Sequence, residues 1–529
     1  MALSVILVEC DVTSPEGVVS TLRFSDRAVF PIGPLDADRA NVAWDERVIE
    51  PPTLRRTLFD DLSTLEPGLS VGVLILANAD RGLDLYQGHI WGDVRVWRWI
   101  FGAPFNTARA LLTGQAAGSP VYDVQSSRAG RVRLTLFDQR LELEKPLQSN
   151  TYGGLNDGET VRYDGDASIR GKPKPLAYGR LLDAHIPAVQ VNHAVGAVQL
   201  HENAITGAEY NSGLMQFFDR GGDAGLEYGG DTSALDDIYF DENLILGENF
   251  VYQSARRGLL KFNANPVGSI ALGYRGALID GVYVETPGPI IRAILERMQI
   301  PEARIGASLT AVACDCVIGA FASDPLTARE FVGWIASAGP LAVLPDRGGT
   351  WQAVLLRPPG ETADLTLTAD EVLSLEADES QPLIGGEFAV GWDRLWTTYR
   401  RDNLQVELLD TPQETRLAEA YRYAVVEDAD FKARSPSWRK MKIDTPLRLE
   451  ADAAALAATL KTLFGLRADG RPRRIWRVVI EMTNEVLDVE LGATVALETP
   501  MWGVADRFLL IGEEPLRPRR DQITWTLWG

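Results

Sequence analysis

Cysteine is scarce in this sequence. The chain has 529 residues and three cysteines, Cys10, Cys314 and Cys316. Three thiols cannot form the disulfide framework of a small secreted domain, and the Cys-x-Cys pair has no second pair to complete a four-thiolate zinc or cluster site. The sequence therefore predicts buried, reduced cysteines and no metal or cofactor.

Long apolar runs are also missing. The longest, such as residues 71–77 and 312–322, are far shorter than the roughly 20 residues that a membrane-spanning helix needs. The N-terminus lacks the basic start of a signal peptide and reaches Glu9 before any long apolar stretch. We therefore expect a soluble protein with no secretion signal and no membrane insertion.

Positive charge is in short supply. The chain has 52 Lys and Arg against 73 Asp and Glu, a formal net charge of −21. Such a balance repels nucleic-acid phosphates and argues against a surface that grips DNA. An acidic surface equally suits a protein from a salty habitat, so charge alone does not indicate a function.

A recognisable nucleophile motif is missing as well. Residues 68–72 (GLSVG) match the Gly-x-Ser-x-Gly pattern, whose chemistry needs a strand before the serine and a helix after it. Here Ser70 follows a Pro-Gly turn and precedes the apolar run 71–77, which predicts a strand. The motif therefore predicts a strand that begins at a turn, and we expect no enzyme.

Metal-ligand patterns are incomplete. His185, His193 and His201 are spaced by eight residues, which is not a known zinc pattern. Asp164-Gly-Asp166 resembles the start of a calcium loop, but Ile169 and Pro175 occupy the positions of the required glycine and glutamate. The acidic stretch 231–248 has no ligand register and is expected to be a solvated loop. We assign no catalytic, cofactor-binding or metal-binding residue.

The dominant pattern that is present is period-two alternation, which is typical of half-buried strands. It occurs at residues 70–77, 90–99 and 131–144, with Gly-rich and Asp-rich turns between them. This predicts a barrel or sandwich across residues 1–155, followed by a polar linker at 153–171. The fold class is therefore mainly β, in several domains, because a chain of this length exceeds one hydrophobic core.

Helical signals appear only in the second half of the chain. Residues 286–300 show helical spacing after a Pro-rich start, and Thr327 with Glu330 forms a capping-box pattern before a second helix. A hairpin is predicted at 341–356, around the turn residues 346–349. A helix is predicted at 449–464, with strands at 475–481, 486–491, 508–513 and 523–528.

These patterns predict four parts. They are an N-terminal β-barrel domain (1–155), a second β-rich domain (156–284), a middle α+β domain (285–400) and a C-terminal barrel-like domain with a helix (401–529).

Four stretches of the chain resemble one family, in the same order along the sequence. Residues 168–179 (SIRGKPKPLAYG) resemble the signature KGKPKPLxYG of tail-tip hub proteins of long-tailed bacteriophages and related phage-like particles. Residues 136–148 resemble the end of the first domain of those hubs, and residues 265–273 the entry to their middle domain. The C-terminal sequence ITWTLWG, with residues 508–514 before it, is similar to their ending LTLWG.

The resemblance implies a structural role in the virion tail tip, which is assembled in the host cytoplasm. Such hubs have barrel domains near both termini and form a trimer whose six barrels match the hexameric tail. The implied partners are further copies of this chain, the distal tail protein ring, the tape-measure protein and tip or fibre proteins. DNA passes through the lumen without specific binding, and an acidic lumen would let it slide.

Two alternatives remain open from the sequence. Trp91, Trp97 and Trp99, which look exposed, and the many carboxylates favour an envelope or polysaccharide hydrolase at the tail tip. The same aromatics favour a receptor-binding or glycan-binding tip protein. Against both, Trp97 and Trp99 alternate on one strand face, which is also typical of core packing.

Overall fold

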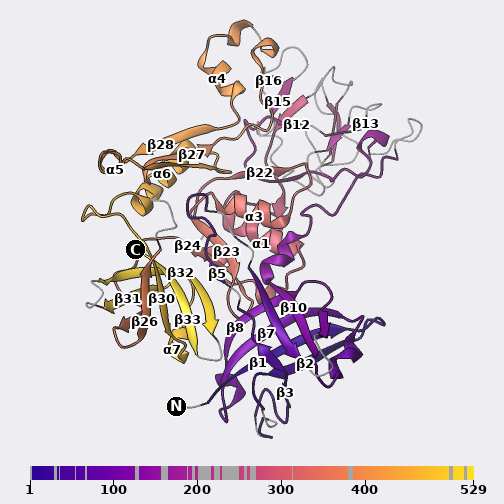
Figure 1. Cartoon of the computed structure of the whole chain (residues 1–529). Helices are drawn as coiled ribbons and strands as arrows, with labels where there is room; N and C mark the ends of the chain where they lie inside the picture. Colours follow the sequence, from indigo (N-terminus) through magenta and orange to yellow (C-terminus); the bar gives the residue numbers. More distant parts are fainter. Residues whose placement is uncertain are drawn as a thin grey trace.

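The structure is a computed structural model of the whole chain (Figure 1). It is mainly β, with barrel-like sheets toward both ends and a few helices, which confirms the predicted fold class. No helix in the part that the structure describes is long and apolar enough to cross a membrane. The residues described are 3–28, 32–34, 36–53, 55–65, 68, 70–124, 130–155, 165–187, 189–192, 197–199, 216–219, 227–228, 250–254, 259–262, 270–311, 314–378, 385–404, 406–499, 504–517 and 521–529.

The first part of the chain forms a nearly closed barrel of nine strands. These are β1 (Ser4–Thr13), β2 (Val19–Ser25), β3 (Asp45–Glu46), β4 (Val48–Glu50), β6 (Val71–Ala77), β7 (Ile90–Ile100), β8 (Arg109–Ala116), β9 (Val121–Val124) and β10 (Gly130–Asp138). Their order is β3-β2-β1-β7-β8-β10-β6-β4, with β9 also on β10. The two end strands, β3 and β4, are separated only by Arg47, so one continuous segment links the two ends of the sheet. It runs parallel to β2 and antiparallel to β6.

The interior of this barrel is filled with side chains. Along β1, alternate residues from Ile6 to Val12 belong to the large hydrophobic core. Val5 and Leu7 point to the other side, into a smaller cluster that includes Trp44 and Phe105. The barrel is therefore a packed core and not a pore.

The three tryptophans of β7 are not exposed, contrary to the sequence-based motivation for a hydrolase or a glycan-binding tip. Trp91 lies in the barrel core and is 1% exposed. Trp99 is buried in the smaller cluster, and Trp97 packs against it, 5.7 Å from Phe105 between ring centroids. Core packing, which strand alternation predicted for Trp97 and Trp99, is confirmed.

A second curved sheet lies toward the C-terminus. Its strands are β25 (Leu365–Thr368), β26 (Val372–Ala377), β30 (Ile475–Glu481), β31 (Thr494–Thr499), β32 (Val504–Arg517) and β33 (Gln522–Trp528), in the order β25-β31-β32-β33-β30-β26. Its end strands, β25 and β26, are again consecutive and separated only by residues 369–371. β25 runs parallel to β31 and β26 antiparallel to β30, so the same kind of segment links the ends of both sheets.

The second sheet takes strands from more than one of the predicted parts. β25 and β26 precede residue 401, and a short strand from the first barrel segment, β5 (Arg56–Thr57), pairs with β32. The fourfold division of the chain stays a prediction.

The α-helices of the described residues lie in the second half of the chain. The predicted helices, hairpin and capping box are confirmed as α1 (Pro287–Arg297), α3 (Ala328–Ala336), α6 (Glu450–Phe464) and the hairpin of β23 (Leu341–Pro345) and β24 (Trp351–Leu355). α6 packs on a three-stranded sheet of β27 (Gly386–Trp392), β28 (Arg422–Glu427) and β29 (Arg439–Asp444). The smaller elements here are β11 (Leu176–Gly179), β20 (Leu278–Ile279), β21 (Val282–Tyr283), α2 (Ser308–Ala311), β22 (Gly319–Ala322), α4 (Pro412–Ala418) and α5 (Ala429–Arg434).

Short strands fill the described parts of residues 186–273, where a β-rich module was predicted. They are β12 (Ile186–Pro187), β13 (Val189–Asn192), β14 (Ala197–Gln199), β15 (Gln216–Asp219), β16 (Glu227–Tyr228), β17 (Phe250–Ser254), β18 (Leu259–Phe262) and β19 (Ile270–Gly273). They form two four-stranded sheets.

One predicted strand is confirmed only in part, and another is wrong. The strand expected at 131–144 ends at Asp138, because the Asp138 carboxylate accepts a hydrogen bond from the Arg140 amide at 2.9 Å and starts a 3₁₀ helix, Gln139–Glu144. The strand expected at 486–491 is instead the short helix α7 (Asn484–Leu487) and a loop, capped by Thr483. Its apolar residues are buried without belonging to a strand.

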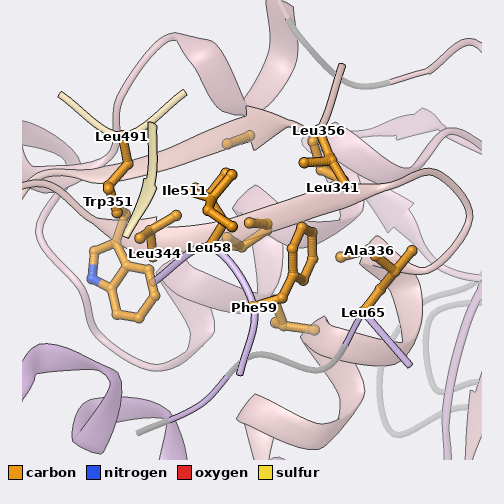
Figure 2. Close-up of a cluster of buried hydrophobic side chains, with 14 of the residues drawn as sticks. Leu58, Phe59, Leu65, Ala336, Leu341, Leu344, Trp351, Leu356, Leu491 and Ile511 are labelled. Carbon is orange, nitrogen blue, oxygen red and sulfur yellow. The ribbon is translucent and has the colours of Figure 1, made fainter. Parts of the chain in front are cut away.

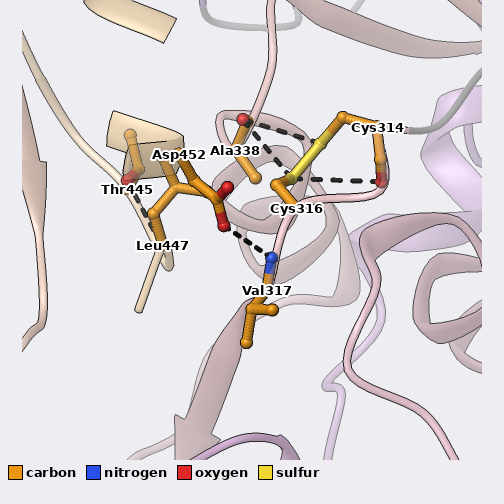
Figure 3. The surroundings of a disulfide bond; sticks show 7 residues. All are labelled: Cys314, Cys316, Val317, Ala338, Thr445, Leu447 and Asp452. Carbon is orange, nitrogen blue, oxygen red and sulfur yellow. Dashed lines mark hydrogen bonds between the residues drawn. A yellow bond between two sulfur atoms is a disulfide. The ribbon is translucent and has the colours of Figure 1, made fainter. Parts of the chain in front are cut away.

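The prediction of reduced cysteines holds for one of the three. Cys10 is free and buried in the first barrel. Cys314 and Cys316 form a disulfide, so the prediction for this pair is wrong (Figure 3). Both sulfur atoms lie 3.8 Å from the Ala338 carbonyl oxygen. The sequence argument considered only a framework of disulfides between distant cysteines. The structure instead has a disulfide between two cysteines that are two residues apart.

The capping box of α3 gives a first prediction. The Thr327 hydroxyl accepts a hydrogen bond from the Glu330 amide at 3.2 Å, and the Glu330 carboxylate accepts one from the Thr327 amide at 2.8 Å. Replacing Thr327 with alanine should lower the free energy of unfolding by about 1 kcal/mol, because it removes the partner of one amide. Thr327→Ser is the control and should stay near wild type in urea unfolding. Equal losses in both variants would contradict a capping role.

Candidate functional site: the junction of the two barrels

The two barrel-like sheets are joined by backbone pairing. β5 adds to β32 at Arg56 opposite Glu513 and Thr57 opposite Gly512. The next residue, Leu58, donates its amide hydrogen to the Ile511 carbonyl at 2.9 Å. This pairing over three successive residues places the first barrel against the second sheet in one fixed register.

An apolar cluster covers this pairing (Figure 2). Leu58 and Phe59, just after β5, lie among side chains of β32 and of the β23–β24 hairpin, including Ile511, Leu344 and Trp351. Each of these five side chains is 6% exposed or less. At roughly 25 cal/mol per Å² of apolar surface buried, such a cluster stabilises the junction far more than surface ion pairs could.

Beside the apolar cluster lies a buried charge cluster of three residues, Arg56, Arg347 and Glu513. Arg56 follows the first barrel's closing segment, Arg347 is in the β23–β24 turn and Glu513 is on β32. The Arg347 Nε donates to Glu513 at 3.0 Å, and Arg56 donates to the same carboxylate and, at 3.1 Å, to the Pro345 carbonyl. Three regions of the chain therefore meet at one carboxylate.

The electrostatics of the cluster favour the charged forms. Burial by itself would raise the pKa of the Glu513 carboxyl, but the charges of Arg347 and Arg56 outweigh burial and hold the pKa below its usual value. The pKa of Arg56 is raised, because the attraction of Glu513 and Glu490 exceeds the cost of its burial. No feature of the sequence marked these residues, because Glu513 follows an apolar run and its partners are distant in sequence.

Ion pairs at the barrel surfaces extend the junction. Arg98 on β7 pairs with Asp521, beside β33, at 2.8 Å. Arg109 at the start of β8 pairs with Asp488, beside α7, at 2.6 Å. The two barrel-like sheets thus lie side by side within one chain, in contact through strand pairing, apolar packing and charge (Figure 1).

Comparison with known proteins finds no protein family and no curated protein that match the sequence. Solved structures similar to the chain include the tail protein from Neisseria meningitidis, with 10% identity, coverage of 99% of this chain and 96% of that chain, and a TM-score of 0.40. The 43 kDa tail protein of prophage MuSo2 from Shewanella oneidensis has 9% identity, 98% coverage of both chains and a TM-score of 0.39. A prophage tail protein from Listeria monocytogenes has 8% identity, coverage of 98% of this chain and 94% of that chain, and a TM-score of 0.33. All three are tail proteins.

The stretch that carries the strongest resemblance, residues 168–179, begins at the surface and ends in the interior. Its last four residues form β11, all buried, paired with β22 so that Gly179 lies opposite Gly319. Gly179 has φ of +71°, and a Cβ atom there would lie 2.2 Å from the Ile318 carbonyl oxygen. The glycine is therefore required both for the backbone conformation and for the close approach of the two strands.

The residues considered for chemistry do not form a site. Ser70 precedes β6, as predicted, and its hydroxyl donates to the Arg55 carbonyl. His185 is buried and hydrogen-bonded to the Tyr399 hydroxyl at 2.7 Å, and burial lowers its pKa to about 3. Asp166 caps a 3₁₀ turn by accepting from the Ser168 amide.

The other candidate ligands of the sequence lie outside the described residues. They are His193, His201, Asp164 and the acidic stretch 231–248. Within the described ranges, no group of three or more His, Cys, Asp or Glu side chains could hold a metal ion.

Proposed function

We propose that the chain is a structural hub subunit of a phage tail tip, where it forms a trimeric ring at the end of the tail tube. The observation that carries this proposal is the pair of barrel-like sheets, whose ends are linked by equivalent segments and which are held side by side by the β5–β32 pairing. The four ordered sequence stretches support the same role. A structural role also needs no catalytic group, and we propose that the protein is not an enzyme.

Symmetry explains why two barrels in one chain suit this role. Three subunits around a threefold axis would present six barrels, which can meet a hexameric tail ring one to one. Because the first barrel is filled with side chains, DNA would pass along the axis between subunits and not through a barrel. The proposed partners are two further copies, the distal tail ring, the tape-measure protein and tip or fibre proteins.

The distribution of charge bears on how DNA would pass. Residues 201–250 contain 11 acidic residues and one basic residue, about half of the net charge of −21, whereas residues 1–150 contain 19 acidic and 15 basic residues. The first barrel is thus weakly negative, which would let DNA slide without specific binding. The strong acidity belongs to the second part of the chain and not to this barrel.

The proposal predicts a fixed copy number in purified particles. This protein should be present at about half the number of copies of a hexameric tail-ring protein, because three two-barrel subunits match six one-barrel subunits. Quantitative mass spectrometry of particles, with the major tail-tube protein as an internal standard, measures this ratio. Equal copy numbers, or absence of the protein from particles, would contradict the proposal.

A further inference from the structure

One arginine of the middle region lies among three aromatic rings. The Arg394 Cζ atom is 5.0 Å from the ring centroid of Trp396, 5.4 Å from that of Trp334 and 5.8 Å from that of Tyr421. All four side chains are partly exposed, so this aromatic cage is at the surface.

The cage is held rigidly. The Arg394 carbonyl accepts a hydrogen bond from the buried Arg448 at 2.9 Å, and the Trp396 amide donates to the Ala184 carbonyl at 3.0 Å. The Trp334 and Trp396 rings meet edge to face, with centroids 6.2 Å apart. The guanidinium is therefore positioned before any partner arrives, which reduces the entropy cost of binding.

The hydrogen-bonding edges of this guanidinium are unused within the described part of the chain. The nearest carboxylate in sequence, Asp393, is already shared by Arg416 and Arg448, each at 2.8 Å. Arg394 has no hydrogen bond or ion pair from its side chain to any described residue, although its faces are covered by rings. The N–H groups of such a guanidinium remain available as donors. They lie in one plane and match the two oxygens of a carboxylate in a bidentate geometry.

A second cation lies next to an aromatic ring on the same side. Lys442 lies 4.4 Å from the ring centroid of Tyr423, which is 6.3 Å from that of Tyr421, and the Tyr423 hydroxyl donates to the Asp444 carboxylate at 2.8 Å. Trp, Tyr and Arg are the residue types that dominate the binding energy of protein interfaces. This face thus carries two cations and one carboxylate among aromatic rings, on a chain whose net charge is −21.

We propose that the Arg394 cage receives an Asp or Glu side chain from a second copy of this chain. Two copies with a charge of −21 repel each other, so they need a face of opposite sign in order to meet. In a closed ring the interface is heterologous and joins two different faces, so the basic face of one copy meets an acidic face of the next. This inference rests on the ring proposed above and names a contact within it.

The test is the self-association of the full-length chain, measured by sedimentation velocity over a range of concentrations. Arg394→Gln keeps the size of the side chain but removes its charge, and it should weaken the association at least about tenfold. Arg394→Lys should weaken it less than glutamine but measurably, because lysine keeps the charge and loses the fork. Arg439→Gln, an exposed arginine at the start of β29, is the control and should associate like wild type.

The outcomes separate this inference from the proposed function. Far-UV circular dichroism and thermal unfolding establish that each variant is folded. A wild-type trimer together with an unchanged Arg394→Gln trimer would overturn the cage contact and leave the ring standing. A wild-type chain that stays monomeric at every concentration would overturn the self-associating ring and the cage contact together.

Discussion

Replacing Glu513 with glutamine should lower the free energy of unfolding by about 3–5 kcal/mol, because it leaves two buried guanidinium groups with only the partly exposed Glu490 as a counter-charge. Arg56, Arg347 and Glu513 are each 8% exposed or less, so water cannot replace the lost carboxylate. Urea unfolding at neutral pH measures the loss. Glu490→Gln is the matched control, since Glu490 contacts the same two arginines but is 44% exposed, and its loss should be below about 1 kcal/mol.

The same variant should change the acid dependence of stability. The folded-state pKa of Glu513 is lowered, so its contribution is complete above the unfolded-state pKa of about 4.3 and is lost as the pH falls toward the folded-state value. The difference in stability between wild type and Glu513→Gln should therefore narrow below about pH 4. A difference that is constant with pH would contradict a charged Glu513 in the folded state.

Replacing Gly179 with alanine should cost about 3 kcal/mol or more, because two penalties combine. An alanine at φ of +71° would be strained in the left-handed conformation, and its Cβ atom would overlap the carbonyl oxygen of Ile318, the residue before the paired strand β22. β11 and β22 would have to separate, and both are buried. Thermal unfolding and the yield of folded protein report the effect.

Gly171, in the same sequence motif, is the control for this substitution. Its φ is +78°, but nothing lies within 4 Å of a Cβ atom there. Gly171→Ala should therefore lower the free energy of unfolding only by the cost of the left-handed conformation, about 1–2 kcal/mol. Equal losses at the two positions would show that the strand contact at Gly179 adds nothing.

Local elements could be predicted because their signals are local. The strand at residues 71–77 coincides with β6, since alternation and its flanking turn are contained within one short segment. The capping box at Thr327 and the turn between β23 and β24 were equally visible, because each depends on residues only a few positions apart. The wrong strand at residues 486–491 shows the limit of prediction from apolar patterns. Buried residues are apolar in a helix or a loop as well as in a strand, so the pattern does not distinguish them.

Contacts between distant segments could not be predicted. β5 is only two residues long, so its sequence has no alternation to detect. The sequences of β25 and β26 likewise do not show that these strands belong to the second sheet. The buried partners Arg56 and Glu513 look like ordinary surface charges in the sequence, and the aromatic rings around Arg394 come from three separate segments. Gly179 is the last residue of the stretch that carries the family resemblance, and the structure supplies the physical reason for a glycine there.

The pairing of β5 with β32 also sets an order of events during synthesis. Arg56 and Glu513 are 457 residues apart. At about 5–20 residues per second, β32 leaves the ribosome roughly 20–90 s after β5. All nine strands of the first barrel lie within residues 4–138, so this barrel can close long before then, while β5 still has no partner. The two halves of the chain are thus joined late in biogenesis, and the chain cannot acquire its two-barrel shape until β5 has paired with β32.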